Sequence, residues 1–193
     1  MSYYTQNDEE RVILNYFGNF TGTLLDIGAN DGLTFSNSAR LIEMGWKAVL
    51  VEPHPGAFSK LELVYMNNSN VQCMNVAISN HFGLVKFHSG SDSLLSTLDE
   101  NQTHLWKGTT FEDGEVMSFD YRSLTDAVAI DKFDFISIDA EGMDWIILQQ
   151  IDLSKTKMLC IEVGPHKTEI MKYCLDSGMK KIHQTYENLI FAR

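Results

Sequence analysis

The stretch from residue 23 to residue 32 constrains the fold of this chain more than any other part. It reads Thr-Leu-Leu-Asp-Ile-Gly-Ala-Asn-Asp-Gly. Its first four residues are typical of a buried strand, a turn follows between Gly28 and Gly32, and residues 34–44 have a helical pattern. This order places backbone N–H groups at a helix N-terminus, beside the carboxyl end of a parallel sheet. Open α/β folds bind their ligands at that edge, so the sequence predicts a ligand site here.

The side chains of the turn indicate which ligand it accepts. A dinucleotide fingerprint needs G-x-G-x-x-G, whereas this turn reads G-x-x-x-G and carries the carboxylates Asp26 and Asp31. Carboxylates repel a pyrophosphate and suit cationic groups, of which S-adenosylmethionine has two, an ammonium and a sulfonium. Glu52 ends the next predicted strand (47–52) and lies about 20 residues past Gly32, where an acid meets a ribose hydroxyl pair. The alternative is a tight turn with a surface acid and no ligand.

Length and composition are those of one globular domain. A chain of 193 residues is long enough for one α/β core and short for two, so residues 1–193 are predicted to form a single domain. The formal net charge of -11, without a basic cluster, argues against a nucleic-acid partner. No apolar run reaches the ~18 residues of a membrane span, and the first residues lack a signal-peptide pattern, so a cytoplasmic location without a membrane span is expected. An odd set of three cysteines indicates reduced thiols.

Helical and strand patterns alternate along the chain. Within residues 1–20, the segment 7–17 predicts a leading helix. Further helices are expected at 55–65, 123–128, 142–150 and 168–175, and strands at 71–78, 84–88, 116–121, 133–139, 158–163, 180–185 and 188–192. Strands that alternate with helices predict a doubly wound, mostly parallel sheet, and the short final connection makes the C-terminal strand antiparallel.

Residues 89–115 are rich in Ser, Thr, Gly and Asp and have no clear period. A loop of this length in a compact domain indicates a functional lid or a mobile segment. Its hydroxyl side chains and apolar anchors suit a cover over a polyhydroxyl acceptor. A loop without function, packed by the same apolar residues, is the alternative.

Six short segments stand in order with compatible spacing. They are Asp-Ile-Gly-Ala-Asn-Asp-Gly (26–32), Val-Glu-Pro (51–53), Asn-Val-Ala-Ile-Ser (75–79), Leu-Ser-Thr-Leu (95–98), Ile-Asp-Ala-Glu-Gly-Met-Asp (138–144) and Ile-Glu-Val (161–163). With these segments, nearly the whole chain resembles the FkbM-type S-adenosylmethionine-dependent methyltransferases. The resemblance implies a Rossmann-like seven-stranded methyltransferase fold and O-methylation of a hydroxyl on a sugar, a glycan or a glycosylated small molecule. One position departs, because Ser137 stands where the family commonly has a lysine.

The turn and the resemblance together predict the site residues. The predicted S-adenosylmethionine-binding residues are Asp26, Gly28, Ala29, Asn30, Gly32, Glu52, Pro53 and Ala77. Methyl transfer to an alcohol needs alignment and removal of the hydroxyl proton. Asp139 and Glu141 end a core strand at the edge where Gly28 also lies, and both are predicted to be catalytic. In related folds the residue at Asp139 approaches the methyl end of the cofactor, which leaves Glu141 for the acceptor. The alternative is that Glu141 caps the helix that starts at Gly142.

Other groups near this edge leave alternatives open. His54 and His166 follow strands, and a capping or surface role is expected for each. Asp139, Glu141 and Glu162 together would suit Mg²⁺, but no ligand-dense motif supports a metal, and none is predicted. The favoured reading is a methyltransferase with a small-molecule or glycan substrate. A non-catalytic nucleoside-binding module is the second hypothesis, because the lysine at position 137 is missing, and an NAD-type dehydrogenase is the third. The oligomeric state stays open.

Overall fold

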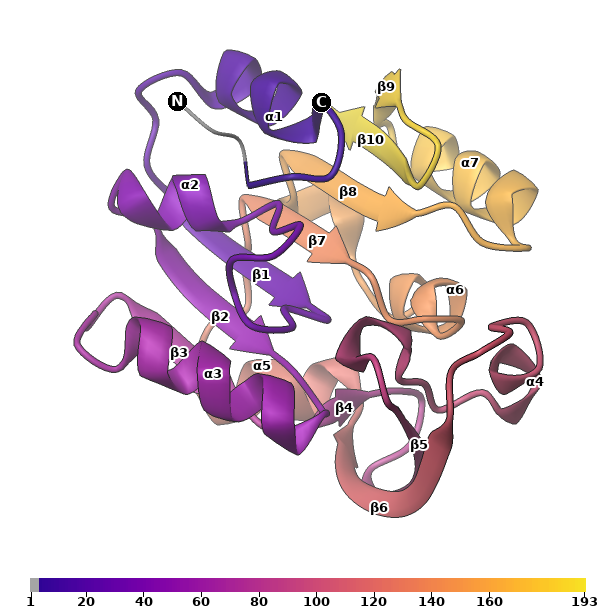
Figure 1. Ribbon diagram of the computed structural model, residues 1–193. Helices are drawn as coiled ribbons and strands as arrows, with labels where there is room; N and C mark the ends of the chain where they lie inside the picture. Colours follow the sequence, from indigo (N-terminus) through magenta and orange to yellow (C-terminus); the bar gives the residue numbers. More distant parts are fainter. Residues whose placement is uncertain (1–3) are drawn as a thin grey trace.

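The computed structural model describes residues 4–193 and is built on a seven-stranded sheet with helices on both faces (Figure 1). The strand order is β3-β2-β1-β7-β8-β10-β9. The bounds are β1 Thr23–Ile27, β2 Lys47–Val51, β3 Val71–Met74, β7 Phe135–Ile138, β8 Met158–Glu162, β9 Lys180–Gln184 and β10 Asn188–Ala192. Neighbours from β3 to β8 pair in parallel, whereas β10 is antiparallel to both β8 and β9. The predicted doubly wound, mostly parallel sheet with an antiparallel last strand is confirmed.

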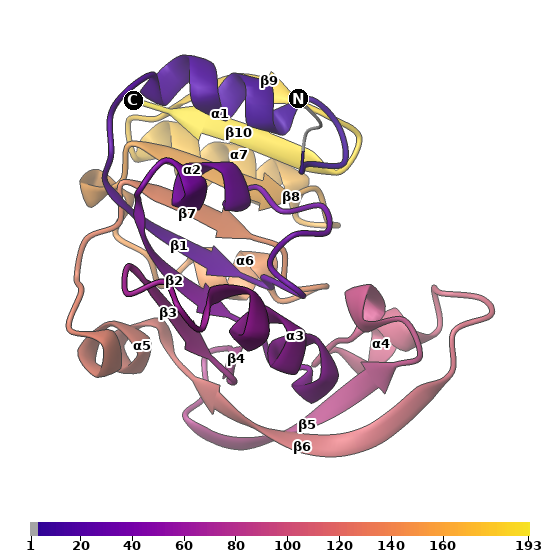
Figure 2. The same cartoon turned by 60° about the vertical axis from the view of Figure 1, so that its left-hand side comes forward.

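Helices cover both faces of this sheet (Figure 2). One face carries α1 (Glu9–Phe17), α2 (Ala39–Glu43) and α3 (Pro55–Tyr65), and the other carries α5 (Tyr121–Val128), α6 (Asp144–Leu148) and α7 (Lys167–Asp176). A short 3₁₀ helix, η2 (Leu153–Lys155), precedes β8. Parallel sheets covered in this way leave their ligand-binding edge at the carboxyl ends of the strands.

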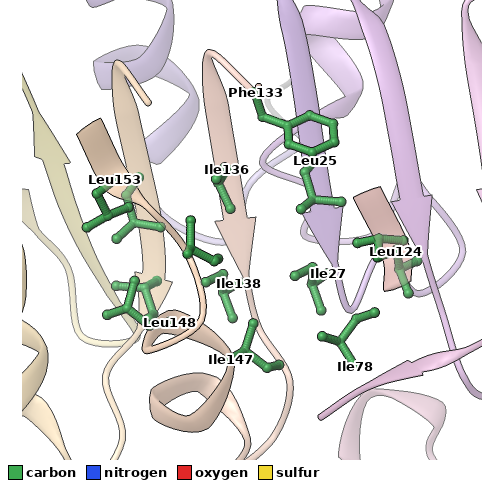
Figure 3. Packing of buried hydrophobic residues seen from close by; sticks show 14 of the residues in the cluster. Leu25, Ile27, Ile78, Leu124, Phe133, Ile136, Ile138, Ile147, Leu148 and Leu153 are labelled. Atoms are coloured by element: carbon green, nitrogen blue, oxygen red, sulfur yellow. The ribbon is translucent and has the colours of Figure 1, made fainter. Parts of the chain in front are cut away.

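The core lies on both sides of the sheet, because the central strands are apolar on both faces. Along β1, Leu24 belongs to the same cluster as Trp46, while its neighbour Leu25 belongs to the opposite cluster. Figure 3 shows Leu25 with Ile136 and Ile138 of β7 in this second cluster. Each fully buried side chain of this size contributes ~1.5–3 kcal/mol, so the strand ends that carry the site rest on a rigid base.

A second sheet has the order β4-β6-β5, and its hairpin of β5 and β6 reaches away from the main sheet (Figure 2). The bounds are β4 Ala77–Ile78, β5 Gly83–Gly90 and β6 Phe111–Phe119, with η1 Ser93–Leu95 and α4 Glu100–Thr103 between β5 and β6. The single strand predicted at 71–78 is therefore wrong. The Asn75 side chain donates hydrogen bonds to the carbonyls of Glu52 and Pro53 (2.8 and 3.1 Å), and the chain leaves the main sheet there.

The sequence interpretation of residues 89–115 as one irregular loop is also wrong at both ends. Residues 89–90 belong to β5 and residues 111–115 belong to β6. Most of β6 is exposed. The strand predicted at 116–121 covers only its second part. Residues 111–115 are held by their ladder with β5 rather than by the core, so they lack the hydrophobic alternation by which a strand is recognised in a sequence.

The helix predicted at 34–44 is shorter than expected. The Asp31 carboxylate accepts hydrogen bonds from the N–H groups of Leu33 and Thr34, Phe35 has a left-handed backbone (φ 55°), and α2 begins only after Ser36 caps the N–H of Ala39 at 3.0 Å. Asp and Ser side chains compete with the helix for backbone donors, which delays its start. The glycine turn therefore does not lead directly into a helix N-terminus.

At the other end of the sheet, α1 closes over the last hairpin. Glu9 is buried, and its carboxylate accepts hydrogen bonds from the side chains of Thr185 (2.8 Å) and Asn188 (3.2 Å). Residues 1–3 of the predicted leading segment lie outside the described residues. Within residues 4–193, no helix combines the length and the apolar character needed to cross a bilayer. All three cysteines are free thiols.

Candidate active site

A cavity of about 420 Å³ opens at the carboxyl ends of β1, β2, β7 and β8. This volume lies in the range of small-molecule sites, roughly 300–1,000 Å³. The predicted site residues on its wall are Asp26, Gly28, Ala29, Asn30, Glu52, Pro53, Ala77, Asp139 and Glu141. Gly32 is not among the described residues that line it. Nine of the ten predicted site residues thus line this one cavity.

The glycine turn is shaped by close backbone contacts. Gly28 has φ 86°, and a Cβ there would lie 1.7 Å from the carbonyl oxygen of Asp139, so only glycine fits between the ends of β1 and β7. Gly32 has φ 80°, and a Cβ there would meet the side chains of Leu61 and Tyr65 at 2.6 and 2.7 Å. Tyr65 also donates a hydrogen bond to the Gly32 carbonyl (3.0 Å). Gly32 therefore serves the packing of α3 rather than the cavity.

The two acids of this turn have different environments. Burial raises the pKa of Asp26 to about 6, although hydrogen bonds from Ser38 and Ser137 oppose the shift. Asp31, which is not among the predicted binding residues, accepts hydrogen bonds from its own loop, at the N–H groups of Leu33 and Thr34. Burial also opposes ionisation of Asp31, but hydrogen bonds from Thr34 and the Leu33 N–H lower its pKa below the ordinary value. Asp26 alone of this pair reaches the cavity.

Glu52 is fixed by two backbone donors. It is 5% exposed, and its two carboxylate oxygens accept hydrogen bonds from the N–H groups of Asn30 (2.8 Å) and His54 (2.7 Å). Asn30 itself has a left-handed backbone, with φ 47°. Burial raises the pKa of Glu52 to about 7. Each oxygen of this carboxylate has a second lone pair, so the group remains able to accept hydrogen bonds from a ligand.

The histidines flanking the site have the roles expected from the sequence. The Nδ1 atom of His54 accepts hydrogen bonds from the N–H groups of Gly56 and Ala57, both at 3.1 Å, and so caps α3. His166 is exposed and lies 3.8 Å from Glu169. Neither His54 nor His166 is among the described residues that line the cavity.

Carboxylates gather where β7 and β8 end. One oxygen from each of Asp139, Glu141 and Glu162 lies within 4.8 Å of the others. Asp139 is open to the cavity yet enclosed by protein on its remaining sides, and burial together with the charge of Asp144 raises its pKa. Burial and the charges of Asp139, Asp144 and Asp92 raise the pKa of Glu141 to about 9. These are the effects that place functional acids near neutral pH, although structural clusters also show them.

Asp144 holds the backbone beneath these acids. Its carboxylate accepts hydrogen bonds from the N–H groups of Ala140 (2.9 Å) and Gly142 (3.2 Å). A hydrogen bond between Asp144 and Glu162 raises the pKa of Glu162 further, after the larger effects of burial and neighbouring charge. The helix of this segment, α6, begins at Asp144 rather than at Gly142, and the alternative role of Glu141 as its cap is not seen in the described contacts.

Oxygen ligands at this spacing are those that a hard divalent cation prefers. Asp139, Glu141 and Glu162 are the residues that could hold such an ion. The prediction that the protein uses no metal stays a prediction.

Several cavity residues escaped the sequence interpretation. They include Phe35, Glu187 and Asn188, whereas residues 93–98 and Trp106 belong to the segment predicted as a lid. Glu187 and Asn188 carried a readable signal, because a terminal strand antiparallel to β8 begins at the carboxyl edge, as the pairing of Asn188 with Glu162 shows. Phe35 lies in the part of the helix predicted at 34–44 that is a loop in the structure.

The charge of the cavity wall has one sign. Six carboxylates line it, and among the described residues no lysine, arginine or histidine does. The carboxylates are Asp26, Glu52, Asp139, Glu141, Glu162 and Glu187. A cationic or neutral ligand fits this wall, whereas a phosphate-rich ligand meets repulsion without a compensating base.

The family model described as the methyltransferase FkbM domain matches residues 26–186. The chain belongs to the FkbM methyltransferase family. Membership implies a methyltransferase that uses S-adenosylmethionine. A search of curated proteins finds no significant match.

Solved structures that resemble this FkbM protein show the same fold at low identity. The precorrin 8W decarboxylase of Methanobacterium thermoautotrophicum has a TM-score of 0.52 and 13% identity over 100% of this chain and 92% of its own. The precorrin-6y C5,15-methyltransferase of Geobacter metallireducens has a TM-score of 0.51 and 12% identity, over 100% of this chain and 92% of its own. The ribosomal protein L11 methylase of Lactobacillus delbrueckii subsp. bulgaricus has 0.51 and 12%, over 95% of this chain and 75% of its own. The Rossmann-like methyltransferase fold implied by the sequence is confirmed.

Proposed function

We propose that this protein transfers the methyl group of S-adenosylmethionine to a hydroxyl of a sugar, a glycan or a glycosylated small molecule. Residues 1–193 then act as one methyltransferase domain, with residues 89–115 as its lid. The observation that carries the proposal is the shared cavity: Asp139 and Glu141 line the same space as Glu52 and the glycine turn.

The residues on the wall fit the proposed cofactor. Glu52, held by the N–H groups of Asn30 and His54, offers its free lone pairs to a ribose hydroxyl pair. Asp26 and Asp139 supply negative charge for the ammonium and sulfonium groups, while Gly28, Ala29, Pro53 and Ala77 shape the wall. The acidic wall does not fit the pyrophosphate of NAD, which disfavours a dehydrogenase.

S-adenosylmethionine supplies an activated methyl carbon when it is bound. The protein must align the acceptor, exclude water and remove the hydroxyl proton. In our proposal, Glu141 takes this proton on a carboxylate oxygen and Asp139 lies toward the donor end. Glu141 carries a proton at neutral pH in the empty cavity, because its pKa is about 9. Positive charge in the cavity lowers that pKa and makes the carboxylate available as a base.

The acceptor side of the cavity suits a neutral polyhydroxyl compound. Residues 93–98 contribute hydroxyl groups and leucines, and Trp106 and Phe35 add aromatic surface. Hydroxyl groups and aromatic faces are the contacts that a sugar ring uses. The cation-free wall of described residues disfavours anionic acceptors and supports the prediction that nucleic acid is not the substrate.

The test is transfer of labelled methyl groups from S-adenosylmethionine to a panel of sugars, glycolipids, phosphorylated sugars, small alcohols and a short RNA. We expect label in a neutral hydroxyl compound. Label only in RNA or phosphorylated sugars would contradict the acceptor class. Tight binding of S-adenosylhomocysteine without any turnover would favour the non-catalytic module, whose sequence signal is Ser137.

A further inference from the structure

The base proposed above has a strained backbone. Glu141 has φ 47°, in the left-handed region, and Gly142 follows with φ 100°. A residue with a Cβ adopts this conformation only where its surroundings enforce it, and such positions gather at functional sites. The direction of the Glu141 side chain therefore depends on whatever holds its peptide.

Thr97, from the insertion between β5 and β6, contacts that peptide. Its Oγ1 donates a hydrogen bond of 2.6 Å to the Glu141 carbonyl, across 44 residues of sequence. The same oxygen accepts a hydrogen bond from the Asp99 N–H at 2.9 Å. A hydroxyl has one proton. The Asp99 N–H occupies one lone pair of the Thr97 oxygen, and the hydroxyl proton is donated to the Glu141 carbonyl.

Thr97 is itself firmly placed. It is 1% exposed, and its backbone forms a two-way bridge with His88 of β5, with N···O distances of 2.9 and 3.1 Å. A second contact comes from α4, where the Gln102 side chain lies so close to Gly142 that a Cβ there would be 3.0 Å away. The insertion thus contacts both left-handed residues that follow β7, Glu141 through Thr97 and Gly142 through Gln102.

We propose that Thr97 is a positioning residue: its hydroxyl holds Glu141 in the left-handed conformation that directs the carboxylate into the cavity. This inference rests on the function proposed above. It means that docking of the insertion completes the acceptor site, in addition to covering it.

The test compares Thr97→Val, which keeps the shape and removes the hydroxyl, with Thr97→Ser, which keeps the hydroxyl. Thr103→Val is the matched control, because the Thr103 hydroxyl bonds only within its own helix, to the Glu100 carbonyl, and does not line the cavity. We expect Thr97→Val to lower kcat roughly ten- to a hundred-fold, the scale of a misplaced catalytic group. The KM for the cofactor and the affinity for S-adenosylhomocysteine should stay unchanged. Thr97→Ser should recover most of kcat, and Thr103→Val should match the wild type.

A second readout does not need the acceptor. Carbon-13 NMR of glutamate-labelled protein, assigned with Glu141→Gln, reports the backbone conformation at Glu141 through the chemical shift of its Cα. In Thr97→Val this shift should move away from that of a left-handed residue, because the hydrogen bond that holds the Glu141 carbonyl is lost. An unchanged Cα shift in a folded Thr97→Val protein overturns the inference, as does wild-type kcat in that variant. Absence of transfer to any acceptor by the wild type contradicts the proposed function instead, and the Cα shift then decides the role of Thr97 separately.

Discussion

At the scale of single residues, the site is built from carboxyl groups whose neighbours set their charge. Burial raises the pKa of Asp26 to about 6 and of Glu52 to about 7, and the Glu141 carboxyl titrates higher still. A pKa above the ordinary value means that the protonated form is favoured in the empty fold. A ligand that brings positive charge or hydroxyl donors therefore stabilises the ionised form of each of these carboxyl groups.

The first prediction concerns Glu52. Replacement by alanine removes a charge-assisted acceptor from the proposed ribose position. It also removes the partner of the Asn30 N–H, which donates a hydrogen bond to Glu52 in the unmodified protein. Glu52→Ala should weaken S-adenosylhomocysteine binding by ~1.5–3 kcal/mol, or roughly ten- to a hundred-fold. Calorimetry measures this directly. Wild-type affinity in the variant, or tight NAD binding by the unmodified protein, would contradict the assigned role.

The second prediction separates the two proposed catalytic acids. Asp139→Asn and Glu141→Gln keep the shape of each side chain and remove its charge. A group that acts only on the acceptor proton should lower kcat and leave cofactor affinity intact. We expect this pattern for Glu141 and a loss of both quantities for Asp139. Full activity in both variants would exclude these acids, and cavity residues such as Glu162 would be tested next.

At the scale of elements, the insertion between β5 and β6 connects the two halves of the site. Besides the contact of Thr97 with the acceptor side, the Ser93 hydroxyl donates a 2.9 Å hydrogen bond to the Asn30 side chain. Asn30 in turn donates to Glu52. One short segment thus contacts the glycine turn and the loop after β7, although β6, the strand that follows it, is largely exposed.

The third prediction follows from this placement. Residues 93–96 and 98 are only partly buried, so their amides should exchange quickly in the free protein, whereas the buried Thr97 N–H, bonded to the His88 carbonyl, should be protected. Exchange should slow when S-adenosylhomocysteine and an acceptor are both bound, as expected for a lid. Hydrogen exchange with mass spectrometry measures both states. Equal protection in the two states, or unchanged turnover after Leu94–Leu98 is replaced by a glycine linker in a folded protein, would show that this segment is no lid.

At the scale of the whole molecule, the distribution of charge decides which ligands enter. The formal net charge is -11, and six of the acids line one cavity with no base among the described residues there. Such a cavity attracts cations and holds protons when it is empty.

The fourth prediction is a pH dependence that differs between two ligands. As pH rises through about 6 to 7, Asp26 and Glu52 lose protons in the empty protein. A cation favours the ionised forms, so S-adenosylmethionine should bind more tightly as pH rises and should release protons at pH 6. S-adenosylhomocysteine lacks the sulfonium charge and should show a smaller rise. Calorimetry in buffers of different ionisation enthalpy measures the protons released. The same pH dependence for both ligands would mean that these acids do not sense the sulfonium.

The sequence by itself determined the order of the elements and the edge of the sheet at which the cavity opens. Hydrophobic period and glycine position are local properties, and they suffice to place Gly28, Glu52, Asp139 and Glu141 at the ends of parallel strands. The same local signals failed for residues 34–38, where Asp31 and Ser36 compete for the helix donors, and for residues 111–115 of β6, which depend on their partner strand.

Only the tertiary structure decided which groups meet in the cavity and what charge they carry. The proximity of Glu162 to Asp139 and Glu141, and the contact of Thr97 with the Glu141 carbonyl, join segments far apart in sequence. Proton affinity follows from burial and from neighbouring charges in three dimensions, so no pattern along the chain encodes it. The end of a strand sets the position of an acidic residue. The packing of the other segments around that residue sets the direction of its side chain and the pKa of its carboxyl group.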